Sequence, residues 1–176
     1  MRIKKILGTV GLVGNVLNQK SSSKKDAYSC DYVNNLYQYC DIMLDSQHSL
    51  TFSGTQWETK IIPFNKLNSK QGDFSLENNG IKIGKGVSKV RITYGINTVV
   101  GTNRDTGFQL RKNGEAIVGK GVYFSSFSLV SDTFVLDVKE GDVLTLHIQN
   151  NWAESINIQL RGGSSPSTHM LVEKVG

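Results

Sequence analysis

The sequence predicts an all-β protein, an antiparallel jelly-roll sandwich with a short N-terminal arm and helix in front of it. Beyond about residue 50 the chain consists of short β-branched, aromatic or alternating runs bounded by Gly, Asn, Asp or Ser, without helical periodicity. Gly114 in "KNGEA" and Gly141 in "KEGDV" stand where chain reversals need a positive φ. Many short strands with regular turn signals are typical of sandwiches and jelly rolls.

The composition predicts one main domain. A chain of 176 residues with 38% hydrophobic content can bury one substantial core. We expect an attachment arm over residues 1–25, a short helix and connector over 26–50, and the sandwich over 51–176. Its strands are predicted at 57–65, 72–84, 87–100, 107–119, 122–131, 133–150, 155–163 and 167–175.

The N-terminal segment is basic and then apolar. Its apolar run is too short to cross a bilayer, contains three glycines, and is followed by no A-x-A-like cleavage site. We interpret it as an arm that is buried against a partner; a signal peptide and a membrane-surface anchor are the alternatives. The apolar residues of this arm are Ile6, Leu7, Val10, Leu12, Val13, Val16 and Leu17.

A short helix is predicted to follow the arm. Ser23 or Asp26 can cap it, and an apolar stripe recurs every three or four residues. The stripe consists of Tyr28, Tyr32, Leu36, Tyr39 and Met43. It can pack on the chain's own domain or on other copies of the chain. A helix would hold Cys30 and Cys40 roughly 15 Å apart, beyond the reach of a disulfide, so we expect two free thiols.

The charge distribution argues against a nucleic-acid partner. The formal net charge is +5, but residues 1–25 carry six basic groups and no acid, which leaves 14 basic and 15 acidic residues in the rest. His48, His147 and His169 are far apart in sequence and predict no metal site. No nucleophile with an adjacent base and no phosphate-binding loop before a helix is found, so we expect neither catalysis nor a cofactor.

Residues 55–176 resemble the C1q/TNF-like jelly-roll family. The resemblance is carried in order by "GDFSLENNGIKIGKGVSKVRITYGI", "FQLRKNGEAI", "SFSLVSDTFVLDVKEGDVLTLHIQN" and "GGSSPSTHMLVEKV". It implies the fold and a homotrimer, because members of the family are typically homotrimers. The sequence lacks the aromatic-rich pattern of animal members, for instance at His169 and Met170, so their receptor functions are not carried over.

Residues 15–45 resemble a short connector of bacteriophage fibre and baseplate proteins. The match is carried by Asn18, Ser21 to Ser23, Lys25, Asp26, Ala27, Tyr28, Ser29, Tyr32 and Asn34. In those proteins such a connector commonly precedes a trimeric adhesive tip. The resemblance implies a head-fibre, tail-fibre or baseplate component that is attached to another virion protein through its N-terminus.

Adjacent apolar pairs in the predicted strands support a trimer independently. A strand with one solvent-exposed face should alternate apolar and polar residues, whereas a strand covered on both faces can be continuously apolar. The pairs occur in "KIIPF", "DVLTL" and "HMLVE". Together with the aromatic stripe they give the candidate trimer-packing residues Tyr28, Tyr32, Leu36, Tyr39, Ile61, Ile62, Leu144 and Met170.

We therefore expect an exposed virion appendage that decorates the particle or recognises the host surface. Stacking on an exposed aromatic ring plus neutral hydrogen bonds would bind a host glycan. Trp152 in a polar loop is the first candidate for this, and Arg104 with Asp105 is a second, separate one. A secreted bacterial C1q-like adhesion protein with a signal peptide is the alternative, and an enzyme of the tail apparatus is a third hypothesis.

Overall fold

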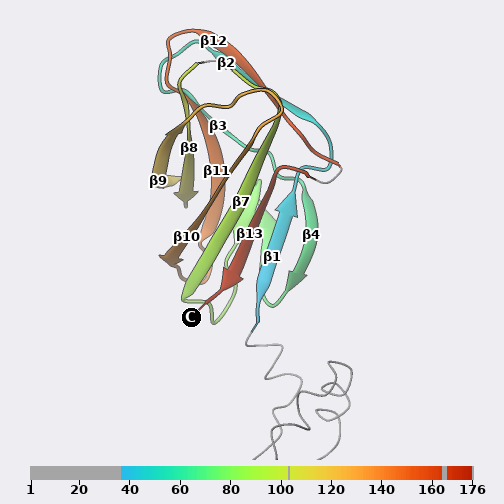
Figure 1. Ribbon diagram of the computed structural model, residues 1–176. Helices are drawn as coiled ribbons and strands as arrows, with labels where there is room; N and C mark the ends of the chain where they lie inside the picture. The colour runs from blue at the N-terminus through green and yellow to red at the C-terminus, as the bar shows by residue number, and fades with distance from the viewer. Residues whose placement is uncertain (1–36, 103, 164–165, 176) are drawn as a thin grey trace, which may run out of the picture.

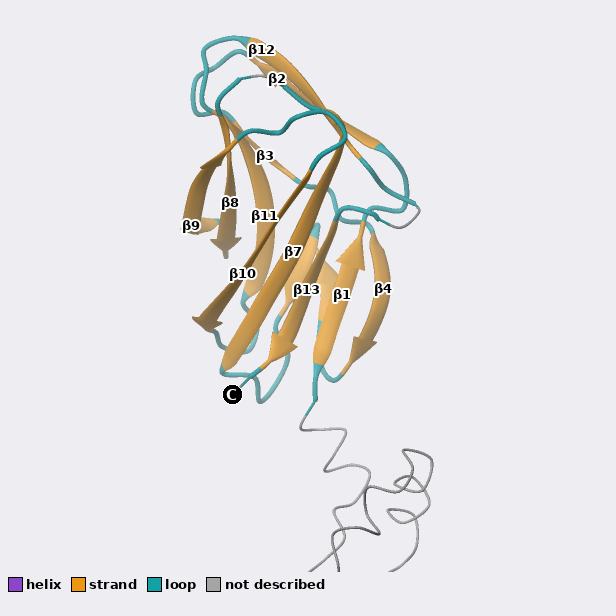
Figure 2. Ribbon diagram, viewed as in Figure 1, coloured by secondary structure: helices purple, strands orange, loops and turns teal. Residues whose placement is uncertain are grey.

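The computed structural model describes residues 37–102, 104–163 and 166–175 of the chain. Within these ranges thirteen strands form two antiparallel sheets that pack face to face, and no helix occurs (Figures 1 and 2), so the all-β prediction is confirmed. No helix among the described residues is long and apolar enough to span a membrane. The strands are β1 (Tyr39–Met43), β2 (His48–Ser53), β3 (Thr59–Ile61), β4 (Lys66–Gln71), β5 (Ser75–Glu77), β6 (Gly80–Lys82), β7 (Lys89–Val100), β8 (Thr106–Lys112), β9 (Glu115–Val122), β10 (Leu129–Asp137), β11 (Val143–Asn150), β12 (Ser155–Leu160) and β13 (His169–Lys174).

The first sheet is organised around the long strand β7. Its order is β2-β12-β7-β13-β1-β4, and β10 pairs with β7 at the side. Along β7, Val90, Ile92 and Tyr94 face the core and alternate with Arg91 and Thr93, as the sequence pattern "VRITY" predicts. Of the described strands, β10 pairs with β7 alone, so its other edge is open.

The second sheet has the order β5-β6-β11-β8-β9, and β3 pairs with β11. Asn113 and Gly114 turn β8 into β9 with φ of 55° and 85°, as predicted, because a two-residue hairpin of this kind needs two positive φ values. Asn78 and Asn79 turn β5 into β6 in the same way with φ of 50° and 61°. The single strand predicted over 72–84 is therefore wrong, since "ENNG" is a turn.

The core lies between the two sheets and is rich in aromatic side chains. Tyr94 of β7 and Phe108 of β8 meet there with ring centroids 4.9 Å apart, and Phe134 of β10 closes the cluster from the sheet edge. Both Tyr94 and Phe108 are almost fully buried. The Tyr94 and Phe108 rings are tilted by 55° to each other, and aromatic pairs of this kind contribute about 0.5–1.5 kcal/mol beyond their area burial.

The helix predicted up to Met43 is wrong at its C-terminal end, because residues 39–43 form β1 between β13 and β4. Cys40 and Ile42 face the core, and Tyr39 and Met43 share the outer face. Residues four apart share a face in a strand as well as in a helix, so the spacing of Tyr39 and Met43 did not distinguish the two. The domain therefore starts before residue 51. The rest of the helix, Cys30 and the arm residues lie outside the described residues, as does most of the connector.

Three candidate trimer-packing residues belong to the core of the single chain. Ile62, Leu144 and Met170 are all 0% exposed. In each adjacent apolar pair one member faces inward and the other, Ile61, Val143 or Leu171, is partly exposed on the outer face. Strand alternation explains this, since two neighbouring side chains cannot both face outward. Tyr39 and Ile61 are partly exposed, whereas Tyr28, Tyr32 and Leu36 lie outside the described residues.

Candidate functional site: two tryptophan loops

The last residue of β11, Asn150, anchors two loops that each carry an exposed tryptophan. Its backbone carbonyl accepts a hydrogen bond from the backbone N–H of Trp57 (2.7 Å), and its Oδ1 accepts one from the backbone N–H of Trp152 (3.1 Å). Its Nδ2 donates to the Glu154 carbonyl (2.9 Å), and its own N–H donates to the Glu58 carbonyl (2.8 Å). Asn150 is 0% exposed, and both the oxygen and the nitrogen of its side-chain amide are hydrogen-bonded within the protein, as buried polar groups generally are. One buried residue thus fixes the β2–β3 loop and the β11–β12 loop together.

Trp152 is capped by an arginine from a third loop. The Arg104 guanidinium lies 5.5 Å from the centroid of the Trp152 ring, within cation–π range, and its Nη2 lies 2.7 Å from the Glu154 carboxylate. The structure therefore joins Trp152 and Arg104, which the sequence treated as separate candidates, in one cluster. Asp105 follows Arg104 in the β7–β8 loop and is half-buried. Because a cation covers one face of the ring, that face is not open for stacking.

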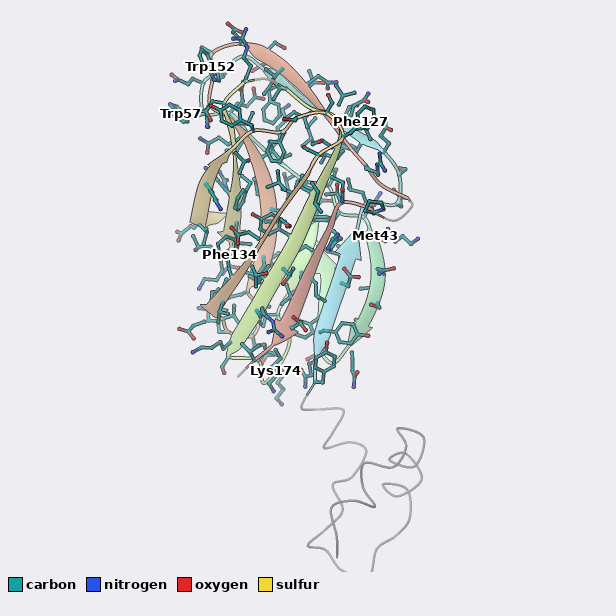
Figure 3. All side chains as sticks on the ribbon, in the orientation of Figure 1. Met43, Trp57, Phe127, Phe134, Trp152 and Lys174 are labelled. Atoms are coloured by element: carbon teal, nitrogen blue, oxygen red, sulfur yellow. The ribbon has the colours of Figure 1, made fainter. Side chains whose placement is uncertain are left out.

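Trp57 is more open and is held in an unusual backbone conformation. Its side chain is 59% exposed, and its φ is 66°. A left-handed φ is uncommon outside glycine and asparagine and is strained for a bulky residue. Next to it, the Glu58 carboxylate accepts hydrogen bonds from the Ser53 hydroxyl (2.8 Å) and the Ser53 N–H (2.6 Å), which together lower the pKa of Glu58. Both tryptophans lie at the same end of the sandwich (Figure 3).

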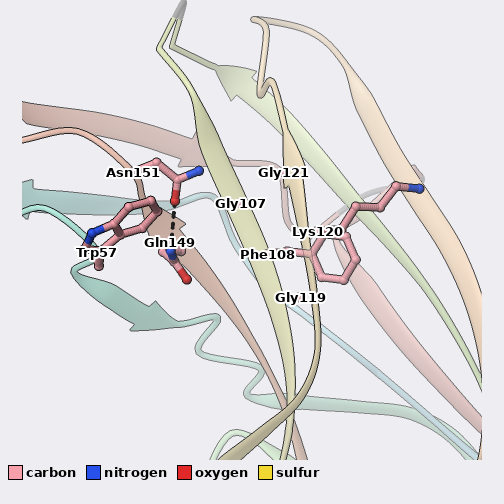
Figure 4. A pocket seen from close by; sticks show the side chains of 8 residues that line it. All are labelled: Trp57, Gly107, Phe108, Gly119, Lys120, Gly121, Gln149 and Asn151. Carbon is pink, nitrogen blue, oxygen red and sulfur yellow. Dashed lines mark hydrogen bonds between the residues drawn. The ribbon is translucent and has the colours of Figure 1, made fainter.

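A shallow pocket of about 210 Å³ lies beside Trp57 on the outer face of the second sheet (Figure 4). Trp57, Gln149 and Asn151 border it with their side chains. Its floor is the backbone of β8 and β9, where the lining residues are Gly107, Phe108, Gly119, Lys120 and Gly121. The Phe108 side chain is buried in the core, and the Lys120 ammonium reaches away to the Asp132 carboxylate on β10 (3.2 Å).

Amide side chains form a continuous hydrogen-bonded row next to the pocket. Arg111 donates through Nη2 to Gln109 (2.7 Å), Gln109 donates to Gln149, and Gln149 donates to Asn151 Oδ1 (2.8 Å). His147 lies on the same face, and burial, aided by the Arg111 charge, lowers its pKa to about 4. Since each amide holds the next, the row fixes the orientation of the Asn151 amide at the pocket.

Sequence reasoning missed Trp57 because it placed this residue at the start of a strand, whereas β3 begins at Thr59. The segment "SGTQW" is a polar run with a glycine and could have been read as a loop. Among the described residues, no group of three or more His, Cys, Asp or Glu side chains is placed to hold a metal ion. The described geometry is that of an open binding surface made of indole rings, amides and backbone.

Comparison with known proteins identifies the fold. The sequence matches no protein family and no curated protein. Among solved structures, murine APRIL has a TM-score of 0.57 at 11% identity, over 79% of this chain and 99% of that one. Eiger TNF from S. frugiperda has a TM-score of 0.55 at 7% identity, over 80% and 92%. Vertex protein P5 of phage PRD1 has a TM-score of 0.56 at 12% identity, over 79% and 97%. The fold is a TNF-like jelly roll, and at these identities the likeness extends to the fold alone.

Proposed function

We propose that the protein is a homotrimeric bacteriophage virion appendage, a fibre or baseplate component, which is attached by its N-terminal arm and carries the tryptophan loops outward. The observation that carries this proposal is that the ends of the described chain and the tryptophan loops lie at opposite ends of the domain. The first and the last described residues lie at the same end of the domain, where the Lys174 backbone N–H donates to the Gln38 carbonyl (2.8 Å). The β7–β8 and β11–β12 loops lie at the other end (Figure 1). An arm joined at one end leaves the opposite end free for contact.

Two further observations support a virion protein. A phage vertex protein is among the structures with the same fold. The connector resemblance in residues 15–45 comes from sequence alone and is independent of the fold. A binding role, without catalysis, fits a site made of indole rings and amides.

An exposed apolar surface at one sheet edge supports self-association. Tyr123, Phe127, Leu129 and Val135 are 66%, 76%, 57% and 60% exposed, and they lie on β10 or on the loop that precedes it. Exposed apolar side chains of this size are typical of interaction sites, and the open edge of β10 offers unpaired backbone groups beside them. A second and third copy of the chain would cover this surface.

Light scattering on the full chain tests the trimer. The wild-type chain should be a trimer at micromolar concentration, and Val135→Asp should shift it towards monomer because the charge would be buried at the interface. Ser49→Asp is the matched control, since Ser49 is exposed on β2 at another sheet edge. A monomeric wild-type chain would refute the trimer.

Incorporation into particles tests the attachment. Leu12→Asp with Val13→Asp should remove the protein from purified particles, whereas Ser22→Asp should leave it in place. Equal amounts of the two variants in particles would contradict attachment through the arm. The alternative, a secreted bacterial adhesion protein, is favoured by the basic and apolar N-terminus. N-terminal sequencing of the exported chain would support it if the terminus were cut downstream of Leu17.

A further inference from the structure

We propose that the pocket beside Trp57 binds one pyranose ring of an uncharged glycan. The sugar would stack its apolar C–H face on the Trp57 indole and lie over the glycine floor formed by β8 and β9. This site is distinct from the capped Trp152 ring and was not among the sites expected from the sequence. Assigning the glycan to a host surface rests on the proposed function, whereas sugar binding itself rests on the pocket alone.

The fold does not require the glycines at the centre of the floor. Gly119 and Gly121 are in β9, and neither has the positive φ that would favour glycine. A Cβ added at Gly119 would come no closer than 3.8 Å to its neighbours, and one at Gly121 no closer than 4.0 Å. At Gly84, in contrast, the same atom would lie 1.3 Å from a backbone oxygen. Since glycine weakens a strand interior, two glycines without an internal reason indicate that something outside the chain approaches closely.

The pairing of the strands places these glycines together on the outer face. Gly107 pairs with Gly121, and Gln109 with Gly119, across β8 and β9, and Gln149 of β11 pairs with Gly107. Partner residues across a ladder point to the same face of the sheet. Three outward positions therefore carry no side chain, and the depression is a direct result of the sequence.

Trp57 is also a residue that the fold does not favour at its position. Its indole is mostly exposed and gains little from burial, and its φ of 66° would suit Gly or Asn better. Strained residues that persist on the surface tend to be functional. The bond from the Trp57 backbone N–H to the carbonyl of the buried Asn150 fixes the Trp57 backbone beside the pocket.

The polar groups at the pocket match the hydroxyls of an uncharged sugar. The Asn151 Nδ2 lies 3.8 Å from the Cβ position of Gly107, over the floor, and donates to no side chain or carbonyl among the described residues. The Asn151 Oδ1 already accepts a hydrogen bond from Gln149, so the group that Asn151 offers to a ligand is its Nδ2 donor. The Lys120 ammonium points away from the pocket (Figure 4) and is paired with Asp132. The Asp105 Oδ1 lies 4.0 Å from the Cβ position of Gly121, where it can accept a hydrogen bond from a sugar hydroxyl and would repel an anionic sugar. The volume of about 210 Å³ is below the ~300–1,000 Å³ of pockets for drug-sized ligands and suits a single ring.

Tryptophan fluorescence tests the proposal because the chain contains only two tryptophans. In Trp152→Phe the emission reports Trp57 alone. Glucose, galactose, mannose and N-acetylglucosamine are titrated to ~50 mM, because single sugars commonly bind in the millimolar range. At least one should shift the emission with saturation, and sorbitol, an acyclic polyol without a ring face, should not. Failure of all four sugars, or an equal shift with sorbitol, overturns the proposal.

Variants of the floor and the rim complete the test on full-length protein. Gly119→Val and Gly121→Val should weaken sugar binding at least about tenfold by filling the floor, with an unchanged or higher unfolding midpoint. Ala116→Val on the same strand is the matched control and should leave binding unchanged. Trp57→Asn should abolish binding without loss of stability. Unaltered binding in both glycine variants, or a changed oligomeric state with wild-type affinity, would overturn the site. Neither result bears on incorporation into particles, so the proposed function stands or falls separately.

Discussion

Replacing Asn150 by alanine should loosen the β11–β12 loop, which carries Trp152, and destabilise the domain, whereas the backbone bonds from Asn150 to Trp57 and Glu58 in the other loop are kept. The substitution removes the bond to the Glu154 carbonyl (2.9 Å) and the bond from the Trp152 N–H (3.1 Å). A hydrogen bond contributes about 0.5–1.5 kcal/mol net, and a partner left unpaired in a buried place costs about 1–3 kcal/mol. Because Asn150 is fully buried, we expect a loss of about 2–3 kcal/mol in the free energy of unfolding.

Urea unfolding followed by circular dichroism measures this loss. Wild type and variant are compared at one protomer concentration, since self-association adds to apparent stability. Asn151→Ala is the control, because Asn151 is partly exposed and its side chain makes one bond, to Gln149. We expect a loss of about 0.5 kcal/mol for the control. Equal losses in the two variants would refute the anchoring role of Asn150. Acrylamide quenching should also reach Trp152 more readily in Asn150→Ala, and unchanged quenching would show that the β11–β12 loop does not depend on this amide.

Three further predictions follow from burial and packing. Burial raises the pKa of Cys40 to about 11, so in Cys30→Ser the remaining thiol should resist alkylation at pH 8 until urea unfolds the chain; rapid labelling of the native protein would contradict its burial. Burial, aided by Arg111, lowers the pKa of His147 from 6.5 to about 4. The unfolded chain then binds a proton between these values that the folded chain does not, so stability should fall as the pH drops from 6.5 to 4, and it should fall less in His147→Gln. Gly84→Ala should cost more than about 3 kcal/mol because its Cβ would meet the Asp73 carbonyl, whereas Gly119→Ala should be neutral or stabilising in the same thermal melt.

Local signals in the sequence predicted the turns and the fold class better than they predicted the ends of the domain. Gly114 and Gly141 have positive φ of 85° and 87°, as expected from their turn motifs. In residues 39–43 the spacing of Tyr39 and Met43 fits a helix and a strand equally, and only the pairing with β13 and β4 decides for the strand. The pairing with β13 joins segments more than 100 residues apart, which no local pattern contains.

The candidate site was predictable only in part for the same physical reason. Trp152 stood out because of its polar flanks, but the Arg104 that caps it comes from another loop. Trp57 depends on a bond to Asn150, 93 positions further along the chain, since 150 − 57 = 93. The glycine floor needs the register of β8 with β9 to bring Gly107 and Gly121 together.

The pocket and the proposed self-association surface are neighbours, so the tests of the two must be kept apart. β9, which carries the pocket floor, ends the second sheet, and the Lys120–Asp132 ion pair ties it to β10, which carries the apolar surface. A substitution at Leu129, beside the loop that joins these strands, would disturb both sites at once. Val135 pairs with Arg91 near the opposite end of β10. A charge at Val135 can therefore separate the subunits while leaving the floor intact. If Val135→Asp lowers sugar affinity as it dissociates the trimer, a neighbouring copy contributes to the pocket; unchanged affinity in the monomer shows that one chain holds the whole site.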